Sequence, residues 1–149
     1  MLKANQNKLT IRRATSADAA RIAELSGQLG YAATSDQIRR RLRRIKPVSQ
    51  NAILVAMSDH NVIGWLHVSV EPLLEMDMRA EVNALVVADE ARGRGAGAVL
   101  LEAAEDWARK HGCKTMSVRS NVLRVRAHQF YQRNGYEHYK TQKAFRKPL

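Results

Sequence analysis

The sequence predicts one α/β domain built on a central sheet, and three observations lead to this prediction. The chain has 149 residues, of which 45% are apolar, and this is enough for one core but leaves little room for a second. Segments with alternating apolar residues are interleaved with segments whose apolar residues recur at helical spacing. The predicted order is β-α-α-β-β-β-α-β-α-β, without an internal repeat, a low-complexity stretch or a linker.

The first half predicts a strand, two helices and a hairpin. Residues 8–14 read as a strand, and residues 15–30 as an amphipathic helix that ends at Gly30. A second helix begins at Ser35 and stops before Pro47. Its polar faces are basic, with Arg39, Arg40, Arg41, Arg43, Arg44 and Lys46. This surface is either merely solvated or contacts an anionic ligand or polynucleotide. Two extended runs, 51–57 and 62–70, then form a β-hairpin.

The second half predicts a further antiparallel strand, a helix that opens with glycines, and three more elements. These segments are a strand at 80–87, a helix from Gly97 to Gly112, a strand at 114–119, a helix at 125–134 closed by Gly135, and a final strand or strand pair within 136–147. All of them fit into the same domain.

Charge and composition narrow the classes of function. A net charge of +11 and a pI near 10.4 favour anionic partners. No apolar stretch approaches the roughly 20 residues of a membrane span, and the N-terminus lacks the apolar core of a secretory signal. We therefore expect a soluble, cytoplasmic protein that does not contact membrane. The only cysteine, Cys113, cannot form an internal disulfide and reads as a small strand residue.

The run "RGRGAG" at 92–97 is the most informative stretch, because glycines before a helix let backbone N–H groups converge on an oxyanion. A P-loop would need Gly-Lys-Ser/Thr where Ala98 and Val99 stand. A dinucleotide fingerprint is formally matched by Gly93-x-Gly95-x-x-Ala98, but residues 113–124 contain no acid for the ribose. The plain alternative is a glycine-rich helix start that holds only water or a buffer anion.

The run also matches Arg-x-x-Gly-x-Gly, and with it the chain resembles the GCN5-related N-acetyltransferase (GNAT) family over nearly its whole length. A second matching segment, "SNVLRVRAHQFYQRNGY", follows in the right order. The resemblance implies the acyl-CoA N-acyltransferase fold, a mixed and largely antiparallel sheet flanked by helices, and one N-acetyltransferase domain over residues 1–149. It implies acetyl-CoA as co-substrate. The implied cofactor-binding residues are Leu85, Val86, Val87, Arg92, Gly93, Arg94, Gly95, Ala96, Gly97, Ala98, Asn121, Ala127 and Tyr131.

Acetyl transfer to an amine needs a base for the amine and a proton for the departing thiolate. The resemblance implies Glu81 as base and Tyr131 as acid. Strand alternation places Glu81 on one face with Asn83, Leu85 and Val87. A carboxylate paired with Arg79 or a lysine, with water as the base, is the alternative for Glu81, and a core position is the alternative for Tyr131. Asn121 departs from the family spacing, since Arg124 stands where the asparagine would fall.

The acceptor stays open at this stage: an amino acid, polyamine, aminophosphonate, aminoglycoside or protein N-terminus all fit. The acids of residues 71–81 suit a cationic amine, whereas the arginines of the second helix suit an anionic one. Rival functions are a basic nucleic-acid-binding module and a catalytically silent acetyl-CoA sensor. The five histidines have no metal-ligand spacing, so no metal site is expected. A homodimer stays open.

Overall fold

The computed structural model describes residues 8–45 and 48–149. Lys46 and Pro47, expected around the end of the second helix, and residues 1–7 of the N-terminus lie outside these ranges. By its internal contacts the chain divides into two units, Met1–Arg119 and Ser120–Leu149. No helix in the described ranges is long and apolar enough to cross a membrane.

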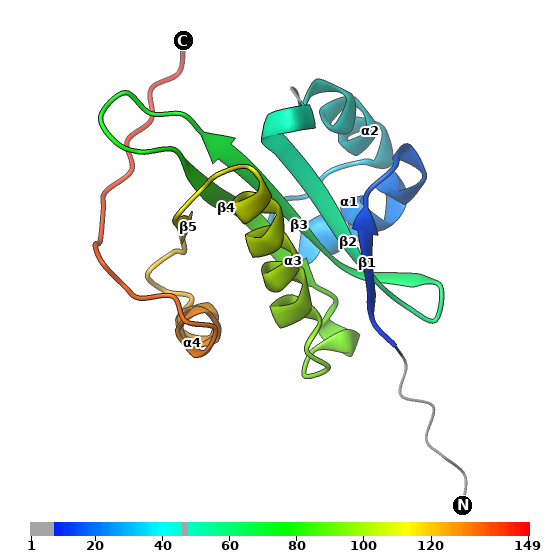
Figure 1. The fold of residues 1–149 in the computed structure, drawn as a ribbon. Coiled ribbons are helices and arrows are strands. Elements are labelled where there is room, and N and C mark those ends of the chain that lie inside the picture. Colours follow the sequence, from blue (N-terminus) through cyan, green and yellow to red (C-terminus); the bar gives the residue numbers. More distant parts are fainter. Residues whose placement is uncertain (1–7, 46–47) are drawn as a thin grey trace, which may run out of the picture. The chain divides into compact units, whose positions relative to one another are not determined.

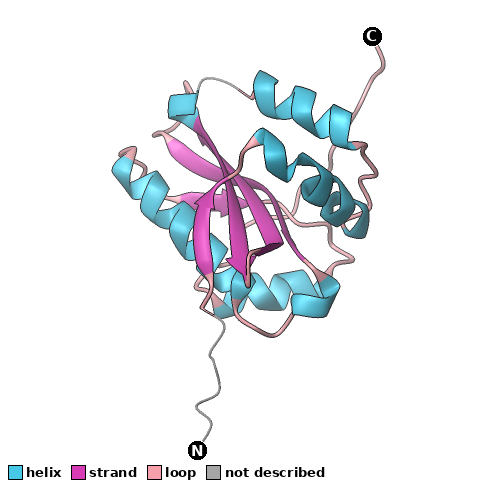
Figure 2. Ribbon diagram, turned by 90° about the vertical axis from the view of Figure 1, so that its right-hand side faces the viewer, coloured by secondary structure: helices cyan, strands magenta, loops and turns pink. Residues whose placement is uncertain are grey.

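The first unit is built on a five-stranded sheet (Figure 1). Its strands are β1 (Thr10–Arg13), β2 (Asn51–Ser58), β3 (Asn61–Glu71), β4 (Arg79–Val87) and β5 (Met116–Val118). They lie in the order β1-β2-β3-β4-β5; the first four are antiparallel, and β5 runs parallel to β4. The strands twist relative to one another, as Figure 2 shows. The prediction of a mixed, largely antiparallel sheet is confirmed.

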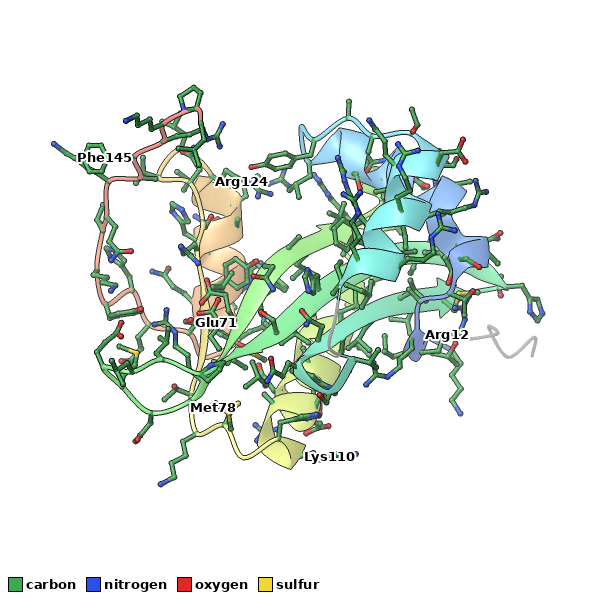
Figure 3. All side chains as sticks on the ribbon, turned by 90° about the horizontal axis from the view of Figure 1, so that it is seen from above. Arg12, Glu71, Met78, Lys110, Arg124 and Phe145 are labelled. Carbon is green, nitrogen blue, oxygen red and sulfur yellow. The ribbon has the colours of Figure 1, made fainter. Side chains whose placement is uncertain are left out.

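Helices cover both faces of this sheet: α3 (Ala96–Lys110) lies on one face, and α1 (Ala19–Gln28) and α2 (Ser35–Arg44) lie on the other (Figure 3). Short 3-10 turns precede α1, β2 and α3. A capping box at Thr34 starts α2: its hydroxyl accepts from the Gln37 N–H at 3.1 Å, and the Gln37 side chain accepts from the Thr34 N–H at 2.9 Å.

The core of the first unit lies between α3 and the face of β3 that carries its even-numbered residues. Leu66 and Val68 of β3 and Leu100 of α3 are fully buried. The odd-numbered residues of β3, which include His67 and Ser69, therefore point to the opposite face, the one that α1 and α2 partly cover. This second face carries the polar side chains discussed below.

A β-bulge in β4 corrects one prediction. His67 of β3 pairs with Ala84 and the next residue, Val68, pairs with Val82, so that Asn83 is the extra residue. After Asn83, the odd-numbered and even-numbered side chains of β4 therefore exchange faces of the sheet. Leu85 and Val87 pair with Leu66 and Gly64 on the α3 face, and they do not share a face with Glu81 as predicted. Asn83 does share it, because its amide donates to the Ser69 hydroxyl at 2.9 Å.

At Gly64, β3 lies close to both β4 and α3. A Cβ added there would lie 2.8 Å from the Val86 carbonyl oxygen and 3.2 Å from Leu100 Cδ1. We expect Gly64→Ala to lower the free energy of unfolding by about 1–3 kcal/mol, because a backbone atom must move. Gly27→Ala in α1 is the control, since a Cβ there meets nothing within 4 Å and alanine favours a helix. Urea denaturation measures both; equal midpoints would contradict this packing.

The second unit contains one helix, α4 (Val125–Arg133), which Gly135 ends with a φ of +88°. The rings of Phe130 and Tyr136 flank Tyr131, with centroids 5.2 and 5.9 Å away. The prediction of a final strand or strand pair within 136–147 is wrong: these residues form no strand, and most are exposed. The segment alternates too few apolar residues among its lysines and arginines to bury one face.

Candidate functional site

The glycine run forms the turn that leads into α3. Gly93 and Gly95 have φ values of +82° and +81°, which only glycine adopts without strain. Gly95 is the N-cap of α3, and no side chain caps the helix. The first intrahelical bond of the turn runs from the Val99 N–H to the Gly95 carbonyl at 3.1 Å. The N–H groups of the preceding helical residues, Ala96 to Ala98, therefore have no intrahelical acceptor.

The space over this turn is open, since a Cβ at Gly93 or at Gly95 would meet nothing within 4 Å. Arg92 and Arg94 are exposed beside it, and Arg92 pairs with Asp89 at 2.9 Å on the surface. Uncapped N–H groups, the positive end of the helix dipole and two arginines fit a diphosphate. The residues present therefore match the pyrophosphate of coenzyme A.

Next to this turn, β4 and β5 part. The ladder between them joins only Ala80, Glu81 and Val82 to β5. Residues 84–87, which include the predicted contacts Leu85, Val86 and Val87, pair with β3 on one side and have no β5 partner on the other. The bulge at Asn83 lies at the point of separation and increases the local twist. Backbone groups of β4 are therefore available to a ligand in this gap.

Glu81 lies directly before the gap and is only 2% exposed. The Ser117 hydroxyl of β5 donates to Glu81 Oε2, and Arg119 Nε donates to Glu81 Oε1 at 2.9 Å. Arg79, the alternative partner predicted for Glu81, pairs instead with Glu71 at 3.6 Å. Glu71 is labelled in Figure 3. Both carboxylate oxygens of Glu81 thus have a partner on or after β5. The alternating Ser117 and Arg119 in "MSVR" were the available sequence signal for this arrangement.

Polar residues that the sequence did not single out continue from Glu81 across the sheet. The pairing of β2, β3 and β4 aligns Asn51, Ser69 and Glu81 in one row. His67 Nε2 lies 3.0 Å from Asn51 Oδ1, which fits a neutral ring that donates from Nε2 and leaves Nδ1 as an acceptor. Burial lowers the pKa of His67 below its ordinary value and favours this neutral form. Only the pairing register, and not the sequence, reveals the row.

The remaining predicted residues belong to the second unit. Asn121 Oδ1 accepts from the Leu123 N–H at 2.9 Å, and its carbonyl accepts from His128 Nε2 at 2.8 Å. Its side-chain oxygen therefore supports the turn before α4. Ala127 is half-buried on α4. Tyr131 is also half-buried, and burial raises the pKa of its hydroxyl above the ordinary value.

No cluster of three or more histidine, cysteine or carboxylate side chains that could hold a metal occurs in the parts of the chain that the structure describes. The chemistry available in these parts comes from the uncapped start of α3, the gap beside β4 and the polar face of the sheet. Together these features suit a phosphorylated ligand at the separation of two parallel strands. Comparison with known proteins identifies the family.

The model of the acetyltransferase (GNAT) family matches residues 21–136, a range that spans both units. An uncharacterized N-acetyltransferase of Bacillus subtilis is 31% identical in an alignment that covers 87% of this chain and 90% of that protein. An aminoglycoside N(6')-acetyltransferase type 1 of Stenotrophomonas maltophilia is 30% identical over 94% of each chain. An aminoalkylphosphonate N-acetyltransferase of Salmonella typhimurium is 32% identical over 60% of each chain.

Among solved structures, the aminoglycoside N-acetyltransferase AAC(6')-Iy in complex with CoA superposes with a TM-score of 0.86. The match covers 99% of this chain and 100% of the other at 20% identity, so it supports the fold. The chain belongs to the acetyltransferase (GNAT) family and is an acetyl-CoA-dependent N-acetyltransferase.

Proposed function

We propose that the protein transfers the acetyl group of acetyl-CoA directly to the primary amine of a small molecule. The observation that carries the proposal is the separation of β4 from β5 beside the uncapped start of α3. The named relatives act on small amines, an aminoglycoside in one case and an aminoalkylphosphonate in another. Direct attack needs only that an amine reach a thioester held in this gap.

The turn at 92–98 holds the pyrophosphate in this proposal. The N–H groups of Ala96 to Ala98 donate to its oxygens, while Arg92 and Arg94 add positive charge. Free backbone groups of Leu85 to Val87 bind the pantetheine arm in the manner of an added strand. A backbone N–H of this segment polarises the thioester carbonyl.

Glu81 accepts the proton of the attacking amine through intervening groups in this proposal. In the alternative, water is the base in place of Glu81. Because the carboxylate is buried, we propose a relay: the amine passes a proton to water, water to Ser117 Oγ, and Ser117 Oγ to Glu81 Oε2. The hydrogen bond from Ser117 to Glu81 already has the direction that the relay needs. The base is required because an ordinary alkylamine, with a pKa near ~10.4, is almost fully protonated at neutral pH.

Tyr131 donates the proton to the departing thiolate in this proposal. Its raised pKa keeps the hydroxyl protonated throughout the neutral range. A thiol has a pKa near ~8.5, so a tyrosine hydroxyl can deliver its proton only as the thiolate forms. Asn121 and Ala127 stay predicted cofactor contacts on the same unit.

Tyr131→Phe is expected to lower kcat by about 10- to 100-fold and to leave the Kd for acetyl-CoA within a few-fold. The substitution keeps the ring between Phe130 and Tyr136 and removes only the proton donor. Tyr131→Ala, which also removes the ring, is the control for packing. Steady-state rates and equilibrium binding of acetyl-CoA separate the two roles. Normal turnover of Tyr131→Phe together with unfolding of Tyr131→Ala would make Tyr131 a core residue.

The proposed function itself is tested by measuring thiol release from acetyl-CoA with a panel of amines. The panel contains polyamines, amino acids, aminoalkylphosphonates, amino sugar phosphates, aminoglycosides and a peptide N-terminus. We expect release that depends on a small amine and saturates with its concentration. Release only with the peptide would shift the function to protein acetylation. Binding of acetyl-CoA without release for any amine would indicate a silent sensor.

A further inference from the structure

A pocket of about 320 Å³ opens on the first unit between α2 and the neighbouring ends of β1 and β2. Three arginines line it, Arg13 from β1 and Arg39 and Arg43 from α2. Leu42 and Ile53 are apolar members of the lining, and Asn51, the β2 member of the polar row of the sheet, also lines the pocket. The pocket therefore joins the arginine-rich helix to the face that carries Glu81.

The charged side chains that line this pocket are all positive. Among the described residues, its lining contains no aspartate or glutamate. Arg39 pairs with Asp36 at 2.7 Å, and Asp36 is exposed. Arg13 and Arg43 form no ion pair within the described residues, and Arg13 Nη1 reaches the Asn51 carbonyl only at 3.5 Å. A net positive charge thus remains in the pocket even when Asp36 is counted.

The acidic residues that would favour a cationic acceptor lie outside this pocket. Glu71 is paired with Arg79, and Glu81 with Arg119. Glu75 and Asp77 lie exposed on the connection between β3 and β4. The acids on the strands are therefore compensated, whereas Arg13 and Arg43 of the pocket are not. Electrostatic complementarity favours an anionic group in the pocket.

The polar row relates this pocket to the reaction centre. Asn51 on β2 pairs with Ser69 on β3, which pairs with Glu81 on β4. Two steps between neighbouring strands span roughly 10 Å. An acceptor with its anion among the arginines and its amine beside Glu81 must therefore hold the two groups about this far apart. Asn51 and His67 contribute polar atoms along this path.

We propose that the acceptor is an amine carrying a phosphate or phosphonate group, which Arg13, Arg39 and Arg43 bind while the amine lies about 10 Å away beside β4. This inference rests on the proposed function and adds the substrate class. Guanidinium groups suit such dianions because they donate two parallel hydrogen bonds to neighbouring oxygens. Apolar contact with Leu42 and Ile53 suits a carbon skeleton between the two groups.

A homologous series of ω-aminoalkyl phosphates with two to eight carbons tests the inference. Binding of each member to the protein saturated with CoA is measured by calorimetry, so the result does not depend on turnover. We expect affinity to rise with chain length toward the members that span about 10 Å. The ω-amino alcohols of equal length, which lack the anion, are expected to bind at least 10-fold more weakly. ω-Amino carboxylates, which carry a single negative charge, are expected to bind more weakly than the phosphates of equal length.

Two variants on the same helix identify the surface. Arg43→Gln is expected to weaken binding of the long aminoalkyl phosphates by about 10-fold, the loss expected for a charge-assisted hydrogen bond. Arg40→Gln removes the same charge from an exposed position of α2 that does not line the pocket, and it is expected to leave the affinity within twofold. Both variants keep a residue that favours a helix.

The inference is overturned if the alcohols bind as well as the phosphates, or if the two-carbon phosphate binds as well as the longest. Equal losses for Arg40→Gln and Arg43→Gln would also overturn it, because they indicate a diffuse basic surface such as a polynucleotide would contact. Thiol release with amines that lack an anionic group, without a preference for the phosphates, would contradict this inference and leave the proposed function intact. Absence of thiol release with every amine would instead contradict the proposed function, while the calorimetric result still decides the site.

Discussion

Gly95→Asp is expected to abolish the thermal stabilisation that acetyl-CoA gives to the parent protein. At a free concentration one hundred times its Kd, the ligand stabilises the parent by about 2.7 kcal/mol. The new carboxylate lies at the N-cap of α3, where the structure provides only N–H groups. Juxtaposition of like charges costs several kcal/mol, so the Kd should rise by about 100-fold or more.

Gly95→Asn is the matched control, because it has nearly the same shape without the charge. Asp and Asn are the non-glycine residues that most often enter the left-handed conformation of Gly95, so both substitutions introduce a similar backbone strain. The two variants should therefore be similarly stable without ligand. Thermal melts with and without acetyl-CoA compare them. If Gly95→Asp gained as much stability from acetyl-CoA as the parent, the turn at 92–98 would not bind the pyrophosphate.

Glu81→Gln is expected to reduce kcat by about 100-fold near neutral pH while acetyl-CoA still binds. The loss should diminish as the pH rises, because a growing fraction of the amine is then neutral without a base. Little stability should be lost. Arg119, the partner that loses its charge pair, is 76% exposed, and water solvates it in the variant. Initial rates from pH 6.5 to 10 and a urea titration measure both effects.

Arg119→Gln distinguishes the base from a structural ion pair. It removes the same pair, with its Nε to Oε1 distance of 2.9 Å, but it keeps the carboxylate and its bond to Ser117. We expect turnover within a few-fold of the parent. Equal losses in Glu81→Gln and Arg119→Gln would assign Glu81 a structural role and leave water as the proton acceptor.

The sequence predicted the parts of the fold that depend on local spacing. Apolar periodicity and glycines located α1, α3 and α4, and the run "RGRGAG" located the turn before α3 because positive φ values need glycine there. The bulge at Asn83 has no such signal, since it contains no glycine and arises from the pairing of β3 with β4. One extra residue reversed the predicted orientation of Leu85 and Val87.

The long-range part of the candidate site could not be read from the sequence for the same reason. Asn51, Ser69 and Glu81 are far apart in the chain, and only the register aligns them. The sequence shows the arginines of α2, but it does not show which of them line a pocket. The pocket that Arg39 and Arg43 share with Arg13 depends on where the fold places α2 relative to the end of β1. The prediction of a final strand is wrong because a strand needs a partner strand, which local propensity does not supply.

The most direct test of the central claim follows the fate of an isotopically labelled acetyl group. Labelled acetyl-CoA is incubated with the protein and a long ω-aminoalkyl phosphate, and the products are analysed by mass spectrometry together with free CoA. Direct transfer predicts one labelled N-acetyl product for each CoA released, and far less product with the Gly95→Asp variant at an acetyl-CoA concentration near the Kd of the parent. Release of CoA with labelled acetate and unchanged amine, or no release at all from a complex that binds acetyl-CoA, would contradict the account.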